Sequence, residues 1–205
     1  HNPLSDGSGF EWPQGSAKYA IFTDGLVWGG LVDGEVRTGG ATYNAGMQAG
    51  YIKGDGQASD PNDPANRIYK IRKVDAVGLT ELELAYQNQM RIDYEEWPTE
   101  LGAPWNDNNN NGIYEPDFEE FLSVGYDECL SDTPFLPGDE TLWFISNDLD
   151  PRRVRDLYGS TPIGLEMHTL VWAYSQTGPL ANMVFTKYMV INKGVNDVTQ
   201  AYLST

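Results

Sequence analysis

The feature that most constrains this chain is a polar loop at residues 105–120, in which oxygen-bearing side chains alternate along the backbone. Three of them stand at every second position: Asp107, Asn109 and Asn111. Ca²⁺ takes about six to eight oxygen ligands, and alternate side chains of a tightly curved loop can converge on one ion. Gly112 allows a sharp turn and places the carbonyl oxygen of Ile113 as a further ligand. The pattern therefore predicts a calcium-binding loop.

Acidic residues after the glycine can complete this site, and the candidates are Glu115, Asp117, Glu119 and Glu120. The predicted ligand set comprises Asp107, Asn109, Asn111, Ile113, Asp117 and Glu119, with the last ligand left open. The loop differs from an EF-hand, because Phe118 stands where the bidentate Glu belongs and no long amphipathic helix clearly follows. It is closer to the DxNxNG loops of the dockerin or thrombospondin type. The alternative interpretation is an Asn-rich polar turn, since Asn and Gly are common turn residues.

Length, charge and composition limit the kinds of partner that the chain can bind. Its 205 residues suffice for one domain, or for one large domain with a subdomain. Thirteen basic and thirty acidic residues give a net charge of −17, which argues against nucleic acid and anionic membranes as partners. No stretch reaches the length of a membrane span, so no membrane insertion is expected. Aromatic residues make up 12% of the chain, which is unlike a disordered composition.

The single cysteine, Cys129, excludes an intrachain disulfide. We expect a small half-buried thiol rather than a reactive one, because the neighbouring Asp127 and Glu128 would raise its pKa. The chain begins at His1 and shows no signal peptide, so either a signal has been removed or this is a piece of a longer chain. A calcium loop suits the extracellular side, where free calcium is abundant.

Most of the chain has the pattern of β-strands. Apolar runs separated by turn residues predict strands at 19–22, 26–32, 35–43, 67–74, 141–146, 164–174, 181–192 and 198–203. Asp33-Gly34 lies between two of these runs and predicts a two-residue hairpin. The predicted fold is a mainly β, antiparallel, jelly-roll-like β-sandwich. Residues 1–18 are expected to form an extended arm held by Phe10 and Trp12, and residues 19–205 a single domain.

One helical insertion, which includes the calcium loop, is predicted at about residues 78–120. Thr80 and Glu83 have the spacing of a capping box. The apolar residues that follow recur every four positions and share one helical face: Leu82, Tyr86, Met90 and Tyr94. The helix should end before Pro98, because the residue before a proline is disfavoured in the α conformation.

Two further segments carry charged or unpaired groups. The cluster Arg152, Arg153 and Arg155 lies among aspartates and is expected to form salt bridges in a turn rather than an anion site. The chain ends inside its last predicted strand, and an unpaired strand edge favours association. We therefore expect further residues beyond Thr205, or pairing of this edge strand with a second copy or another surface protein.

Few residues indicate catalysis. Glu166 and His168 lie two apart on a predicted strand and so share a face. Such a pair can bind a transition metal or transfer protons, but a hydrogen-bonded His is the commoner arrangement. The sequence has no nucleophile elbow, no HExxH and no phosphate-binding loop. No enzyme activity is therefore expected. Exposed tryptophans could stack on glycans, although most tryptophans of a β-rich domain lie in the core.

An ordered set of phrases resembles a known group of proteins. The set comprises Thr23–Gly30 before the hairpin, Trp97-Pro98, Leu101–Trp105 before the calcium loop, Gly138–Phe144, Asn147–Asp150, Gly159–Glu166 and Tyr188–Gly194. It resembles the N-terminal β-rich region of large secreted surface proteins of the Bacteroidetes and Ignavibacteria type, many exported by the type IX secretion route. The resemblance implies the cell surface of a Gram-negative bacterium and a longer parent chain, and it implies no enzyme activity. Similar loops tend to be richer in Asp, so the Asn residues here predict weaker calcium affinity.

Three functions follow as hypotheses. The first is a non-enzymatic extracellular module of a surface or filament assembly, stabilised by structural Ca²⁺. The second is a carbohydrate-binding module with aromatic side chains on an open face. The third is a hydrolase domain that uses Glu166, His168 or an acidic pair.

Overall fold

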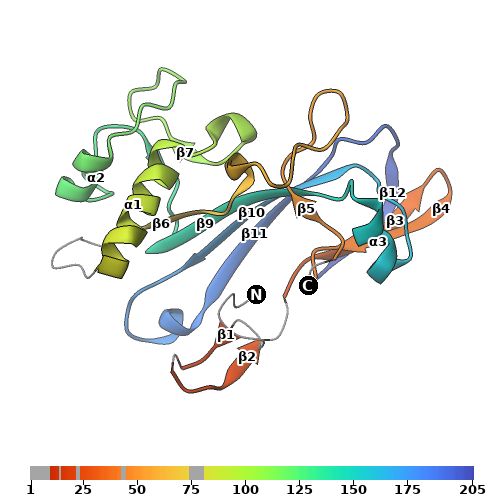
Figure 1. Ribbon diagram of the computed structural model, residues 1–205, viewed down its shortest axis with the longest axis horizontal. Coiled ribbons are helices and arrows are strands. Elements are labelled where there is room, and N and C mark those ends of the chain that lie inside the picture. Colours follow the sequence, from red (N-terminus) through yellow and green to blue (C-terminus); the bar gives the residue numbers. More distant parts are fainter. Residues whose placement is uncertain (1–9, 14, 22–23, 43–44, 74–80) are drawn as a thin grey trace.

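The computed structural model describes residues 10–13, 15–21, 24–42, 45–73 and 81–205, which fold mainly as antiparallel β-sheet with three α-helices (Figure 1). The predicted mainly β, antiparallel fold is confirmed. The prediction of one helical insertion is incomplete, because a third helix lies far outside it. In Figure 1 long strands cross the middle of the molecule, with two helices at one end and a smaller sheet at the other.

The largest sheet has five antiparallel strands in the order β11-β10-β9-β5, and β6 also pairs with β9. These strands are β5 (Gln48–Ala49), β6 (Tyr69–Arg72), β9 (Glu140–Asn147), β10 (Leu165–Ala173) and β11 (Val184–Asn192). Apolar runs between turn residues predicted the four longer ones. The register places His168 opposite Ile145 and Met167 opposite Ser146, so successive residues of β10 face opposite sides of the sheet.

Helices cover one face of this sheet. These are α1 (Glu81–Glu95) and α2 (Phe118–Val124). Met90 and Tyr94 of α1 are buried in a core with Trp97 and Trp143, as their spacing predicted. Helix α1 ends before Pro98, also as predicted. The predicted cap residue Thr80 lies outside the described residues.

The smaller sheet has three antiparallel strands in the order β12-β3-β4. They are β3 (Val27–Val32), β4 (Glu35–Gly40) and β12 (Val198–Ser204). Asp33 and Gly34 both have positive φ, 52° and 79°, which is the two-residue hairpin turn expected from their sequence. A second apolar cluster joins the two sheets and contains Leu26, Trp28, Met47, Leu165 and Met167. The last strand β12 therefore has a partner within the chain, β3, and lies at the edge of its sheet.

Helix α3 (Pro151–Tyr158) stands where a turn was expected. Its end signals were present in the sequence. The side chain of Asp150 accepts a hydrogen bond from the N–H of Arg152, Pro151 occupies the first turn, and Gly159 ends the helix in the left-handed conformation. Two of the three arginines form the expected salt bridges, since Arg152 and Arg153 both pair with Asp150.

The remaining elements are short. Strands β1 (Phe10–Glu11) and β2 (Tyr19–Ile21) pair with each other, so the described part of the predicted arm is a hairpin. Trp12 is about half exposed rather than a buried anchor. Strands β7 (Trp105–Asn106) and β8 (Thr133–Pro134) pair beside the predicted calcium loop. Three 3₁₀ turns complete the described elements: η1 (Pro64–Asn66), η2 (Thr99–Leu101) and η3 (Pro179–Asn182).

Candidate calcium-binding loop

The loop between β7 and α2 is wrapped around its own side-chain oxygens. Asp107 accepts the N–H of Asn111 at 3.1 Å through Oδ1 and the N–H of Gly112 at 2.8 Å through Oδ2. Asn109 Oδ1 accepts the same Asn111 N–H at 2.9 Å, and Asn111 Oδ1 accepts the N–H of Ile113 at 2.7 Å. Gly112 has φ 76°, the left-handed backbone that its lack of a Cβ permits. Three alternating side chains therefore point to the inside of one turn.

Glu115 closes this turn. Its Oε2 accepts hydrogen bonds from Asn109 Nδ2 at 3.2 Å and from Asn111 Nδ2 at 2.6 Å. The carboxylate of Glu115 thus lies next to both side-chain amides, while that of Asp107 contacts backbone N–H groups of the same loop. Glu115 was one of four candidates for the open ligand position and is the one that the structure places beside the loop's amides.

Asp117 and Glu119, two members of the predicted set, have other partners. Asp117 is the N-cap of α2 and accepts the N–H of Glu120 at 2.9 Å. Glu119 forms an ion pair with Arg91 of α1. Asp117 therefore caps a helix, and Glu119 joins two helices. The structure therefore brings Asp107, Asn109, Asn111 and Glu115 together, without a contact that joins Asp117 or Glu119 to them among the described interactions.

Asp132 holds the two ends of the loop together, and it is not among the predicted calcium ligands. This residue is 0% exposed. Its Oδ1 accepts the N–H of Asn108 and its Oδ2 the N–H of Glu115, both at 2.9 Å, so one carboxylate joins the two ends of the loop. No local signal points to Asp132, because its contacts with Asn108 and Glu115 span 24 and 17 positions of the chain and depend on the pairing of β7 with β8.

Glu120 holds the segment that leads into Asp132. It accepts the N–H groups of Leu130 at 3.2 Å and Ser131 at 3.0 Å. These bonds, those to Ser131 first, lower the pKa of Glu120 to about 2. The neighbouring Cys129 is buried, and burial raises the pKa of its thiol. The expectation of an unreactive structural cysteine agrees with this environment.

The donor set of the loop fits a hard cation. Within the described part of the chain, no three His, Cys, Asp or Glu side chains gather in a metal-binding arrangement. A cation on this loop would therefore be held by Asp107 and Glu115 together with amide and backbone carbonyl oxygens, the latter including Ile113. Ca²⁺ accepts such mixed oxygen ligands, and a low carboxylate count corresponds to weak affinity.

The second candidate site, Glu166 and His168, is buried under the loop Gly50–Ser59. Glu166 is 1% exposed, and its carboxylate contacts His168 Nε2 at 2.9 Å and Lys193 Nζ at 2.8 Å. It also accepts the N–H of Ile52 at 2.6 Å. Burial raises the pKa of Glu166, but the hydrogen bonds from His168, Lys193 and Ile52 outweigh it and leave the pKa below its usual value. Both side chains are buried, and the Glu166 carboxylate has three partners, whereas His168 Nδ1 has no hydrogen-bond partner within the described part of the chain.

The tryptophans lie mostly inside the molecule. Trp28, Trp97 and Trp143 are buried, and Trp172 stacks on Phe185 with ring centroids 5.5 Å apart. Trp12 is the tryptophan with the greatest exposure among those described. The described residues therefore present no row of exposed tryptophans of the kind that stacks on a glycan.

Comparison of the chain with protein-family models, with curated proteins and with solved structures finds no match. The described helices include none with the length and apolar character needed to cross a bilayer.

Proposed function

We propose that this chain is a non-enzymatic structural module of an extracellular surface or filament assembly, stabilised by one Ca²⁺ on the loop 107–115. The observation that carries the proposal is the convergence of Asp107, Asn109, Asn111 and Glu115 on one turn. Two carboxylates lie on that turn with N–H donors as their contacts, and a cation would neutralise their charge.

The ion would act on the fold rather than on a substrate. The loop connects β7 to α2, and its base at Asp132 joins the turn to β8. Tyr114 of the same segment donates to the backbone oxygen of Tyr94 at 2.7 Å and so ties the loop to α1. A cation on the loop would therefore hold the helical end of the molecule against the strands. Binding to the folded state alone stabilises that state by mass action.

The location and the assembly are part of the same proposal. The net charge of −17, the oxygen-ligand loop and the resemblance to secreted surface proteins favour the outside of a Gram-negative cell. Strand β12 lies at a sheet edge, and its outward edge is the place where a further strand, from another chain or another part of the parent protein, would complete a β-sandwich.

Isothermal titration with Ca²⁺ tests the ion part. We expect binding in the range of extracellular calcium modules, Kd about 10⁻⁴ to 10⁻³ M. Asp107→Asn and Glu115→Gln each keep the shape of the side chain and remove one ligand charge, so each should weaken binding by about tenfold or more. Asp127→Asn, an exposed acid outside the loop, is the matched control. If Asp107→Asn, Glu115→Gln and the control all have the same affinity for Ca²⁺, the loop is not the calcium site.

A further inference from the structure

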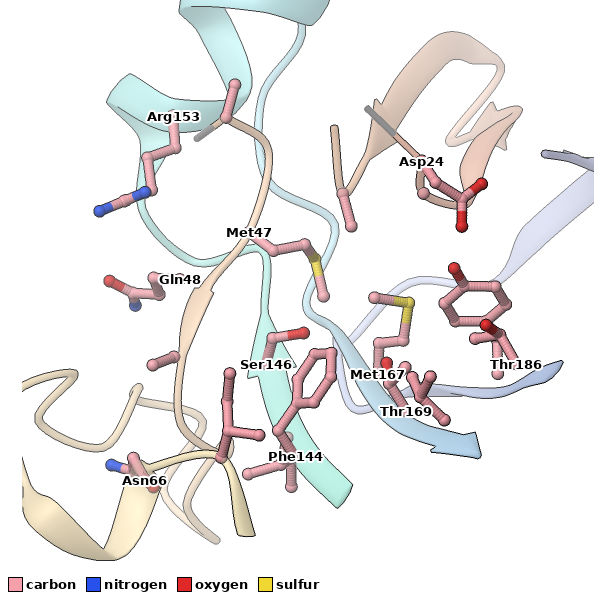
Figure 2. Close-up of a pocket in the computed structure, with 18 of the residues that line it drawn as sticks. Asp24, Met47, Gln48, Asn66, Phe144, Ser146, Arg153, Met167, Thr169 and Thr186 are labelled. Atoms are coloured by element: carbon pink, nitrogen blue, oxygen red, sulfur yellow. The ribbon is translucent and has the colours of Figure 1, made fainter. Parts of the chain in front are cut away.

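The face of the five-stranded sheet that the helices leave uncovered forms a trough of about 460 Å³ (Figure 2). Strand register assigns its floor. Ser146 lies opposite Met167, and Phe144 lies opposite Thr169, so these four side chains point to the same side of the sheet. Met47 closes one end, where the apolar cluster beneath β3 begins. The other end is open, since Val184 of β11 is 50% exposed.

Two hydroxyl groups at the floor lack a hydrogen-bond partner within the described part of the chain: Ser146 Oγ and Thr169 Oγ1. Ser146 is 7% exposed and Thr169 2%. A buried hydroxyl without a partner destabilises the folded state, whereas a hydrogen bond from an occupant would recover that free energy. Both hydroxyls stand on the trough face of adjacent strands, and an occupant would reach both once the side chains that cover them shift.

The lining side chains set the chemistry of that occupant. Phe144, Met47 and Met167 supply apolar surface, and thioether side chains rearrange readily around a ligand. The floor has no charged group, and the charged lining residues Asp24 and Arg153 are exposed. The volume is that of a small-molecule site, and the polar groups lie at its bottom. We propose that the trough binds a small uncharged molecule with an apolar body and a hydroxyl group.

A matched pair of probes tests this proposal: p-cresol and toluene, which differ by one hydroxyl. The methyl groups of Met47 and Met167, labelled with ¹³C, report binding directly by NMR. Both probes should shift these two signals, and p-cresol should bind about 3- to 10-fold more tightly, the effect of one neutral hydrogen bond.

Substitution of the two hydroxyls supplies the decisive comparison. The double variant Ser146→Ala/Thr169→Val should still bind both probes and lose the preference for p-cresol. Thr141→Val is the matched control, because Thr141 Oγ1 is also buried and unpartnered but lies on the helix-covered face of β9. Thermal unfolding shows whether each variant is folded. Equal affinity of the two probes for the unaltered protein, or unshifted Met47 and Met167 signals, would overturn the proposal. If those signals change with protein concentration alone, the trough is an interface between copies and not a small-molecule site.

Discussion

Two carboxylate networks of this molecule differ in whether a basic side chain compensates their charge. Glu166 is buried beside Lys193 and His168, so a cation of its own chain compensates its charge. Asp107 and Glu115 lie on an exposed turn, and their described contacts are backbone and amide N–H groups without a basic side chain. In the first network a lysine of the chain compensates the carboxylate charge, whereas the second has a charge that an external cation would neutralise. Charge compensation, rather than the number of acids, distinguishes a structural ion pair from a candidate metal site.

The largest effect is expected from removal of the loop's base. Asp132→Ala removes a fully buried carboxylate and leaves the partly buried N–H groups of Asn108 and Glu115 without their acceptor. We expect a loss of about 3 kcal/mol in the free energy of unfolding, since two hydrogen bonds to a charged group are lost and each contributes about 1.5–3 kcal/mol. Urea denaturation measures it. Asp132→Asn retains one acceptor oxygen and should lose about half as much, and a loss below about 0.5 kcal/mol for Asp132→Ala would show that the loop does not depend on this residue.

A smaller loss is expected from the buried network. Lys193→Met removes the internal cation from Glu166 and should destabilise the fold by about 2 kcal/mol. The figure lies below that for a fully buried pair, because the Lys193 side chain is 36% exposed and solvent screens the interaction. Lys187→Met, an exposed lysine of β11, is the control. The destabilisation should be the same with calcium and with chelator. A calcium-dependent effect would show that the two networks are coupled.

The smallest effect is a pH dependence at Glu120. Its folded-state pKa is lowered from 4.5 to about 2, so the contact contributes stability above pH 4.5 and loses it as pH falls toward 2. Carboxyl ¹³C NMR should give a titration midpoint of about 2 for the signal that disappears in Glu120→Gln. The same variant should show a shallower loss of stability with acid. A midpoint near the ordinary value of 4.5 would contradict the described hydrogen bonds to Leu130 and Ser131.

Sequence periodicity predicted the elements whose signals are local. The apolar runs of β9, β10 and β11, the four-residue spacing in α1 and the Asp33-Gly34 turn are properties of contiguous residues, and all are present. The sequence predicts a turn at the position of helix α3, because the charged cluster indicates exposed turn residues. The helix signals were the Asp150-Pro151 start and the Gly159 end.

The site was less predictable, because its partners come from distant segments. The alternating oxygens and Gly112 indicated the turn at Asp107, but the placement of Glu115 rather than Asp117 depends on where α2 begins. Asp132 supports the loop through the β7–β8 pairing, and Lys193 reaches Glu166 across two strands. Such contacts follow from tertiary packing and have no local pattern.

The most direct test of the calcium proposal is a crystal structure of the protein grown in calcium, with anomalous diffraction data to locate the ion. We expect one Ca²⁺ bound by oxygens of Asp107, Asn109, Asn111 and Glu115 and by the carbonyl of Ile113, at about 2.3–2.6 Å. Glu166 should keep its contacts with Lys193 and His168 unchanged. A loop without anomalous density at millimolar calcium, with the same hydrogen bonds between Glu115 and the two asparagines, would contradict the account and leave the loop as an Asn-rich turn.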